Sequence, residues 1–228
     1  MKSERAAWVI VPAFNEAARV GDCLRNLLRE NRYQIVVIDD GSSDETADVV
    51  QRFPVWCLTH PINCGQGAAI RTGIDFALAK GAEFIVTFDA DGQHDTDDIE
   101  QLLEPLKEGQ QDVALGTRFL GRTIGMPASR QWLLRVATVF TRLTTGLKLT
   151  DSHNGLRAFS RHAASRITIR QPRMAHASEI LHQVKRHRLR YVEVPVTIRY
   201  TKETLKKGQS ALDAARIGSE LILGRFAK

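Results

Sequence analysis

Asp89 and Asp91 are separated by a single residue, in the segment Asp89–Gln93. An apolar run, Phe84–Phe88, precedes them and predicts a buried strand. The two carboxylates would then lie at the C-terminal tip of that strand, which is where ligands bind in open α/β sheets. Carboxylate oxygens suit a hard divalent cation such as Mg2+ or Mn2+, and a diphosphate can share such a cation. The alternative is a structural turn, with Asp89 capping the strand and Asp91 reversing the chain.

Two further apolar runs end in polar or acidic residues. Trp8–Val11 is followed by Pro12–Glu16, and Ile35–Ile38 is followed by two aspartates. The C-terminal ends of parallel strands lie on one edge of a sheet, so these segments would surround the same crevice as Asp89–Gln93. Like charges that gather there raise the free energy of the fold unless a cation or a hydrogen-bond donor compensates them. Three such strand ends therefore favour a ligand site over three independent caps.

The elements that must position these residues alternate between strands and helices. This alternation predicts an α/β fold with a mostly parallel central sheet, right-handed crossovers and flanking helices. After the first strand, for example, apolar side chains recur at helical spacing at Val20, Leu24, Leu27 and Leu28. The other strands are expected at 55–58, 112–116 and 191–200, and the helices at 17–30, 46–53, 68–80, 96–107, 130–147, 179–186 and 211–226.

Four segments together resemble family 2 glycosyltransferases, which have the GT-A nucleotide-sugar fold. They are Pro-Ala-Phe-Asn-Glu from residue 12, Val-Ile-Asp-Asp-Gly-Ser-Ser-Asp-Glu-Thr from residue 37, Asn-x-Gly-x-Gly-x-Ala from residue 63 and Asp-Ala-Asp-Gly-Gln-His from residue 89. The resemblance extends over about residues 7–200. It is closest to dolichyl-phosphate mannose synthase and the bacterial polyprenyl-phosphate glycosyltransferases.

The resemblance implies which residues bind the nucleotide of the donor, a nucleoside-diphosphate sugar. Pro12, Phe14 and Glu16 would line the nucleotide. Asp40 would hydrogen-bond the base or the ribose, with Asp39 in a supporting role. The resemblance leaves open whether the nucleotide is GDP or UDP, and which hexose it carries.

The resemblance also implies a metal site for Mg2+ or Mn2+. Asp89, Ala90 and Asp91 would lie against the ribose and the diphosphate. Asp91 and Gln93 would hold the cation, with Asp89 near it. Arg118, which follows the strand at 112–116, resembles the arginine that reaches the diphosphate.

The segment 151–160 resembles the acceptor side of the family. It contains Gly155, which lets a backbone approach a ligand closely, and Arg157, whose guanidinium fork suits a pair of phosphate oxygens. The alternative for Arg157 is a surface ion pair. The resemblance places a carboxylate near the acceptor as well, for which Glu179 is the candidate, with helix capping as the alternative.

Basic residues at the end of the expected sheet are candidates for phosphate contact. By resemblance these are Arg199 and Lys207, and the alternative is a solvated run of charge. Between the two halves, Gly121–Ser129 predicts a loop near the site, and 130–147 predicts an amphipathic helix. That helix would either meet the membrane interface near a lipid acceptor or pack on the domain core. Its apolar face consists of Trp132, Leu133, Val136, Val139, Phe140, Leu143 and Leu147, with Thr138, Thr141, Arg142 and Thr145 opposite.

The expected reaction moves a hexose by a single in-line displacement with inversion, and the acceptor decides whether a general base is needed. A sugar hydroxyl needs one, and Glu179 and Asp151 are the evident candidates. A phosphomonoester has a second pKa near ~6 and is already ionised at neutral pH. The basic residues of the second half therefore favour a polyprenyl-phosphate-type lipid acceptor. A sugar or protein hydroxyl acceptor, and a non-catalytic nucleotide-sugar-binding partner subunit, are the alternatives.

Composition sets the outer limits of this interpretation. The chain has 228 residues, 43% of them apolar, which suits a single GT-A domain with a donor half (1–118), an acceptor half (119–210) and a C-terminal helix (211–228). No apolar stretch reaches the ~18 residues of a membrane span, the N-terminus lacks a signal-peptide pattern, and the three cysteines lack zinc-ligand spacing. We therefore expect a cytoplasmic protein. Its net charge of +6 favours peripheral contact with the anionic cytoplasmic face of the membrane. Nucleic acid is disfavoured because the basic residues lack interleaved aromatics for stacking.

Overall fold

The computed structural model describes residues 7–29, 31–171, 173 and 175–200. Lys207 and the expected helix 211–226 lie outside the described residues. The strands are β1 (Ala7–Ala13), β2 (Gln34–Asp39), β3 (Trp56–Thr59), β4 (Phe84–Thr87), β5 (Val113–Ile124), β6 (Arg157–Ser160) and β7 (Tyr191–Arg199). The helices are α1 (Ala17–Leu28), α2 (Thr46–Val50), α3 (Gln66–Ala79), α4 (Asp98–Lys107), α5 (Ala128–Thr145), α6 (Arg161–Ala164) and α7 (His176–Arg186).

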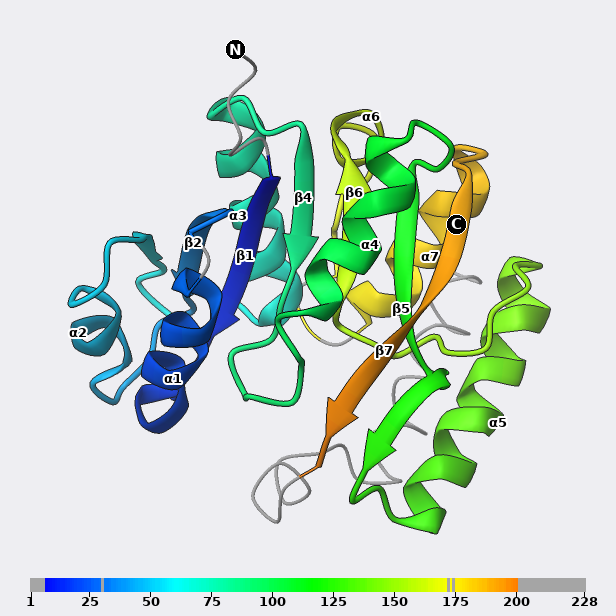
Figure 1. Ribbon diagram of the computed structural model, residues 1–228, viewed down its shortest axis with the longest axis horizontal. Coiled ribbons are helices and arrows are strands. Elements are labelled where there is room, and N and C mark those ends of the chain that lie inside the picture. The colour runs from blue at the N-terminus through cyan, green and yellow to red at the C-terminus, as the bar shows by residue number, and fades with distance from the viewer. Residues whose placement is uncertain (1–6, 30, 172, 174, 201–228) are drawn as a thin grey trace.

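The strands form one seven-stranded sheet in the order β3-β2-β1-β4-β6-β5-β7 (Figure 1). β1 runs parallel to β2 and β4, β2 to β3, and β5 to β7. The mostly parallel sheet expected from the sequence is confirmed. β6 is the exception, because it lies between β4 and β5 and is antiparallel to both. As a result, β6 begins beside the end of β4, and its first residue, Arg157, pairs with Thr87.

Two hydrophobic cores hold the helices against the two faces of the sheet. Val9 and Val11 point into a core with α1 and α4, while Trp8 and Ile10 point into a core with α3, α6 and α7 (Figure 1). This separation follows from the two-residue period of a strand, which sends successive side chains to opposite faces. Burial on both faces explains why these strands are continuously apolar, and each such side chain contributes about 1.5–3 kcal/mol to stability.

The loop expected over Gly121–Ser129 is correct only for residues 125–127, because β5 and α5 occupy the rest. β5 continues to Ile124, and its last residues pair with Thr197–Arg199 of β7 after a register shift that begins at Thr117. The backbones come so close there that a Cβ at Gly121 would lie 2.2 Å from the Val196 carbonyl oxygen. A glycine therefore permits the bulge, and pairing with a distant strand overrides the local loop signal.

Helix α5 packs on the domain with the opposite face from the one expected for a core helix. Its buried residues are Thr138, Thr141 and Thr145, whereas Trp132 is 68% exposed and Leu143 is 80% exposed. The threonines can be buried because their hydroxyls donate to carbonyls one turn earlier in the helix, at 2.7–3.0 Å. One of the two alternatives was that the apolar face of this helix packs on the domain core. For the described residues of the helix, that alternative is wrong. None of the described helices is both long and apolar enough to cross a membrane.

Candidate active site

Asp89 follows β4 and is held by three separate parts of the chain. Gln66 Nε2, at the start of α3, donates to Asp89 Oδ1 at 2.8 Å, and His94 Nε2 lies 3.1 Å from Oδ2. Behind the carboxylate, a Cβ at Gly155 would lie only 2.2 Å from Oδ2. Residue 155 is therefore restricted to glycine, and the absence of a side chain there lets the segment before β6 approach the end of β4.

These contacts keep Asp89 ionised. Burial opposes ionisation, but the hydrogen bond and positive charge of His94, with the charges of His176 and Arg157, hold the pKa of Asp89 below its usual value. The floor of the site thus carries a fixed negative charge.

Asp91 is half-buried and lies beside that charge. Burial, and then the charge of Asp89, raise the pKa of Asp91 to about 6. Its Oδ1 accepts a hydrogen bond from the Gln93 backbone N–H at 3.0 Å, and no described residue donates to Oδ2. This carboxylate pair has an excess of negative charge that the described residues do not neutralise. The chemistry of the donor set therefore fits a hard divalent cation with oxygen ligands.

The residues expected to line the nucleotide lie at the end of β1. Pro12 is buried in the strand, where it pairs with Ile38, and Phe14 is 43% exposed. Glu16 forms a 2.7 Å ion pair with Arg19, and its backbone N–H donates to a threonine hydroxyl at the start of α2. The structure therefore brings the ends of β1 and β2 together, as predicted. Nucleotide contacts at these three residues stay a prediction.

Asp40, just beyond β2, has a full set of partners within the protein. Its Oδ1 accepts from the Cys64 backbone N–H at 3.0 Å and lies 2.7 Å from His60 Nδ1. Its Oδ2 accepts from the Gly65 backbone N–H at 2.6 Å and from Asn63 Nδ2 at 3.0 Å. Asp40 thus anchors the loop that leads into α3. Its contact with a base or ribose stays a prediction, for which this geometry leaves little hydrogen-bonding capacity.

Arg118 in β5 faces the acceptor-side segment. Its Nε donates to Asp151 Oδ2 at 2.6 Å, and its two other nitrogens donate to Tyr200 Oη at 2.5 Å and to the His153 carbonyl at 2.9 Å. Although burial opposes the charge, Asp151 and Tyr200 raise the pKa of Arg118. The side chain is 7% exposed, so in this geometry it supports the site from within. Direct contact with a diphosphate stays a prediction.

Arg157 is the first residue of β6 and is buried beneath the same edge. Its three guanidinium nitrogens donate to the carbonyls of Asn154, Ser152 and Ala177 at 2.9–3.2 Å. Burial lowers the pKa of Arg157 to about 10, although the charges of Asp151 and Asp89 oppose this shift. It therefore remains charged at neutral pH, and no described carboxylate lies within ion-pair distance of it. The surface ion pair considered as an alternative is not what the structure shows.

The two remaining described candidates, Arg199 and Glu179, differ in whether they contact the segment Asp89–Gln93. Arg199 at the end of β7 lies beside the segment Asp89–Gln93, because its backbone N–H donates to the Gln93 carbonyl at 2.9 Å and its side chain meets Asp95 Oδ2 at 3.1 Å. Glu179 in α7 instead accepts from the backbone N–H groups of Arg170 and Gln171, at 2.9 and 2.8 Å. No hydrogen bond or ion pair between described residues joins Glu179 to Asp89–Gln93.

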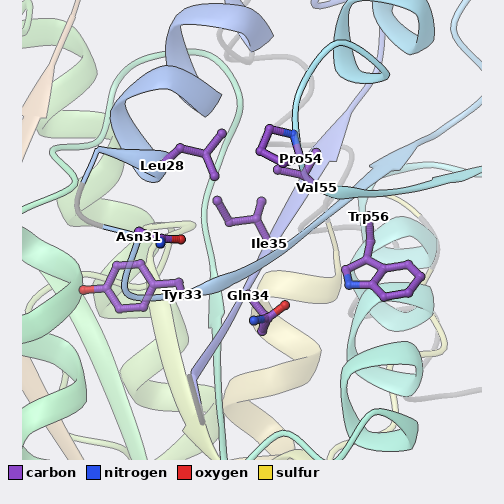
Figure 2. A pocket seen from close by; sticks show the side chains of 8 residues that line it. All are labelled: Leu28, Asn31, Tyr33, Gln34, Ile35, Pro54, Val55 and Trp56. Carbon is purple, nitrogen blue, oxygen red and sulfur yellow. The ribbon is translucent and has the colours of Figure 1, made fainter. Parts of the chain in front are cut away.

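A cavity of about 490 Å³ lies elsewhere, where β2 and β3 begin. Tyr33, Ile35 and Trp56 are among its lining residues, together with the end of α1 (Figure 2). This is the opposite edge from Asp89 and Asp91. Because ligands of open α/β sheets bind at the carboxyl ends of strands, this cavity does not belong to the candidate site.

The family model described as "Glycosyl transferase family 2" matches residues 8–168, which is more than half of the chain. The chain belongs to this family. An uncharacterized protein of Methanocaldococcus jannaschii, MJ1222, is 36% identical over 96% of this chain and 92% of its own length. The UDP-N-acetylglucosamine–dolichyl-phosphate N-acetylglucosaminyltransferase of Methanococcus voltae is 29% identical over 99% of this chain and 98% of its own.

Among solved structures, glucosyl-3-phosphoglycerate synthase from Mycobacterium tuberculosis, in complex with Mn2+ and UDP-glucose, has a TM-score of 0.73. It is 18% identical and covers 97% of this chain and 78% of that chain. This likeness supports the GT-A fold, and the family match makes the chain a glycosyltransferase. Both sequence predictions, and the resemblance to the polyprenyl-phosphate branch, are confirmed.

Two side chains of this glycosyltransferase site received no role from the sequence. Gln66 lies in the Asn-x-Gly-x-Gly-x-Ala segment at one of its variable positions, and its side chain contacts Asp89. His94 completes the Asp-Ala-Asp-Gly-Gln-His segment, but nothing in that spacing shows that its ring turns back onto Asp89. Both residues belong to segments that resemble family motifs, so the sequence contained a signal for each. It did not indicate that their side chains turn toward Asp89.

Proposed function

We propose that the protein transfers a hexose, with inversion, from a GDP- or UDP-sugar to a polyprenyl-phosphate-type lipid, with Mg2+ or Mn2+ as cofactor. The observation that carries this proposal is the meeting of Asp89 and Asp91 with the buried cation Arg157 at one sheet edge. Arg157 pairs with Thr87 in the strand that delivers Asp89. A donor site that needs a cation thus adjoins an acceptor side that supplies positive charge.

On the donor side, Asp91 and Gln93 would hold the metal ion, with Asp89 close by. Such an ion, when bound, would supply Lewis-acid stabilisation of the negative charge that develops on the leaving diphosphate. The chain's own part is to keep Asp89 ionised through His94 and to fix it through Gln66. Arg199, tied to Gln93 by a backbone hydrogen bond, is 54% exposed and lies where it can approach a diphosphate or an acceptor phosphate.

On the acceptor side, the partners of the two candidate bases support a phosphate over a hydroxyl. Glu179 is engaged by two backbone N–H groups, and Asp151 is buried in the ion pair with Arg118. Neither is poised to take a proton from a sugar hydroxyl. An ionised lipid phosphate needs no base, and it needs positive charge for orientation. The Methanococcus voltae relative, whose name gives dolichyl phosphate as its acceptor, is consistent with this choice.

Helix α5 supports peripheral contact with an anionic membrane. Its exposed apolar residues include Trp132, Val139 and Leu143, and exposed apolar residues of β5 are present nearby in the sequence at Leu120 and Ile124. The helix contains no acidic residue and carries three arginines. An amphipathic surface of this kind binds at the boundary between headgroups and acyl chains, and each basic residue near an anionic leaflet adds about 1 kcal/mol.

The test combines donor binding and transfer in the full chain. Thermal shifts would be measured with UDP- and GDP-sugars in Mg2+, Mn2+ or EDTA, followed by transfer of labelled sugar to a polyprenyl phosphate. The matched acceptor control is the same polyprenol without phosphate. We expect a metal-dependent shift with one nucleotide and an organic-soluble product only with the phosphate. Equal labelling of the polyprenol would overturn the phosphate acceptor, and donor binding without transfer would indicate a non-catalytic subunit.

A further inference from the structure

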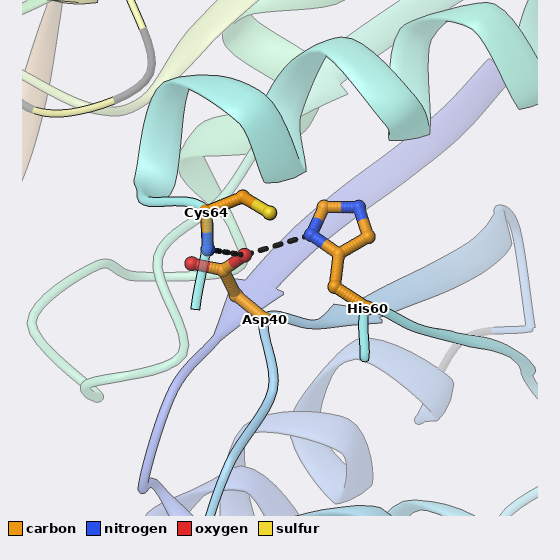
Figure 3. Close-up of side chains that lie close together, drawn as sticks. All are labelled: Asp40, His60 and Cys64. Carbon is orange, nitrogen blue, oxygen red and sulfur yellow. Dashed lines mark hydrogen bonds and ion pairs between the residues drawn. The ribbon is translucent and has the colours of Figure 1, made fainter. Parts of the chain in front are cut away.

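Asp40, His60 and Cys64 form a second cluster of chemically reactive side chains (Figure 3). They lie just beyond β2, just beyond β3 and just before α3. One carboxylate oxygen, one imidazole nitrogen and the thiol sulfur all lie within 4.8 Å of one another. Asp40 is buried, and the other two are partly exposed. In the described part of the chain, no other group of three His, Cys, Asp or Glu side chains meets this condition.

We propose that this cluster binds a thiophilic divalent cation of the zinc class, separately from the Mg2+ or Mn2+ site at Asp91. Zinc binds thiolate sulfur at about 2.3 Å and imidazole nitrogen at about 2.0 Å, so the ligand atoms of a tetrahedral site are roughly 3.5 Å apart. The three ligand atoms of the cluster lie within 4.8 Å of one another, and binding would bring the sulfur closer to the other two. Figure 3 shows the Cys64 side chain pointing toward the His60 ring, so a small rotation about its Cα–Cβ bond would complete the set.

The site is preorganised by hydrogen bonds from outside the ligand atoms. Asp40 Oδ2 is fixed by the Gly65 backbone N–H at 2.6 Å and by Asn63 Nδ2 at 3.0 Å. On the far side of the imidazole, His60 Nε2 lies 2.9 Å from Thr72 Oγ1. A partner of this kind on the second ring nitrogen orients metal-ligating histidines and fixes their tautomer. Thr72 therefore has the position of an outer partner that supports a metal ligand.

The protons balance when the cation binds. The cation takes the place of the proton between His60 Nδ1 and Asp40 Oδ1, which are 2.7 Å apart. The imidazole remains neutral by carrying its proton on Nε2, where Thr72 Oγ1 accepts it. The Cys64 thiol loses its proton to solvent, because the thiolate is the form that binds metal. One proton is released per cation, and the fourth position of the tetrahedron is open to water.

Ligand chemistry separates this site from the one at the end of β4. Asp91 and Gln93 offer only oxygen, which suits Mg2+ and Mn2+, whereas thiolate and imidazole favour zinc and related ions. The alternative is that Asp40, His60 and Thr72 form a hydrogen-bonded chain that binds no metal, beside which the Cys64 thiol donates to the Ile62 carbonyl at 3.4 Å. The two readings differ in whether sulfur becomes a ligand.

The test uses Co2+ as a spectroscopic probe, followed by Zn2+ competition, in the full chain with excess Mg2+ present. We expect a near-ultraviolet thiolate-to-cobalt absorption that saturates at one equivalent and disappears when Zn2+ is added. Cys64→Ser should abolish the absorption, and the matched control Cys57→Ser, at a half-buried cysteine of β3, should leave it unchanged. Thr72→Val should weaken Zn2+ binding about 10- to 100-fold.

Folding of the variants is checked independently. Cys64→Ser keeps the backbone N–H that bonds Asp40, so its metal-free circular dichroism and Tm should match wild type. His60→Gln provides a second ligand variant, which should also lose the absorption. No thiolate absorption in wild type, the same absorption in Cys64→Ser, or displacement of Co2+ by Mg2+ alone would each overturn the proposal.

Discussion

The two halves of the sheet differ in how far their charged side chains are compensated by other protein groups. In the parallel half, β3-β2-β1-β4, the edge gathers Asp89 and Asp91, and the pKa of Asp91 is raised to about 6 by burial and by its neighbour. In the mixed half, β6-β5-β7, the N–H groups of Arg118 and Arg157 are taken up by oxygens of the protein itself. The described residues therefore leave negative charge at the edge of the parallel half uncompensated, whereas they satisfy the hydrogen-bond donors of both arginines in the mixed half.

The largest effect is expected where the mixed half of the sheet would be left with an uncompensated charge. Arg118→Met removes the partner of Asp151, which is fully buried. Removing one member of a buried ion pair costs about 3–5 kcal/mol, measurable by urea denaturation. Arg118→Met combined with Asp151→Leu should recover part of this loss. Arg190→Met, which breaks the exposed pair with Asp112, is the control and should change stability little. Equal losses in the two single variants would contradict the comparison.

The parallel half of the sheet should show the reverse pattern, with activity lost and the fold kept. Asp91→Asn removes a charge that the described residues do not neutralise, so we expect the Tm of the metal-free protein to stay level or rise. Turnover should fall at least about 100-fold, because a catalytic metal ion contributes several kcal/mol to transition-state stabilisation. Sugar transfer and thermal unfolding are measured on the same preparation. A variant that loses stability but keeps turnover would reverse the assignment.

The exposed apolar face of α5 provides the next test. It belongs to the acceptor half, but no described residue covers its exposed side chains. Leu143→Ser should weaken binding to vesicles of anionic phospholipid by about tenfold or more, given about 1.5–3 kcal/mol for burial of a leucine side chain. Ile62→Ser, at a 69% exposed isoleucine before α3, is the matched control. Sedimentation with vesicles measures both. If Ile62→Ser weakens binding as much, α5 is not the contact face.

The pH dependence follows from the raised pKa of Asp91. Below pH 6 a proton competes with the cation, so the apparent affinity for Mn2+ should fall by up to about tenfold per pH unit. For folding the sign is opposite. The pKa of Asp91 is higher in the folded state than the ~3.9 of an unfolded aspartate, so its ionisation destabilises the metal-free fold as pH rises through this window. Calorimetry at pH 5, 6 and 7 should show both trends in wild type and neither contribution in Asp91→Asn.

The smallest effect is expected at Glu179. Glu179→Gln keeps an oxygen for the two backbone N–H groups that it accepts, so the fold should hold. With a phosphate acceptor no base is lost, and turnover should change less than about threefold, whereas loss of a general base lowers the rate by ~10²- to 10⁴-fold. A loss in the larger range, with an unchanged Tm, would point to a hydroxyl acceptor.

The parallel half could be predicted from the sequence because its signals are local. Continuous apolar runs indicate strands buried on both faces, and each is followed by a helix with its own apolar period. Once the strands are parallel, their C-terminal ends must share an edge. That reasoning correctly placed the ends of β1, β2 and β4 together, and Asp89 and Asp91 with them.

The mixed half depended on contacts that the sequence does not encode locally. β6 is four residues long, and only its insertion between β4 and β5 makes it a strand and places Arg157 beneath Asp89. The extension of β5 needs β7 as a partner, from about 75 residues later in the chain. Helix periodicity identified the two faces of α5 correctly, but which face is buried depended on threonines that satisfy their own hydroxyls.

The sequence by itself therefore indicated the family and the GT-A fold, through the resemblance of its four motif segments. It also determined the edge that carries the carboxylates, because apolar periodicity and strand direction constrain that edge. The tertiary structure alone decided which polar groups are already engaged. Asp40, Arg118 and Glu179 each meet partners more than five residues away in the chain, and Gln66 and His94 turn onto Asp89. Hydrogen bonds form between groups that folding brings together, and spacing along the chain does not specify those distances.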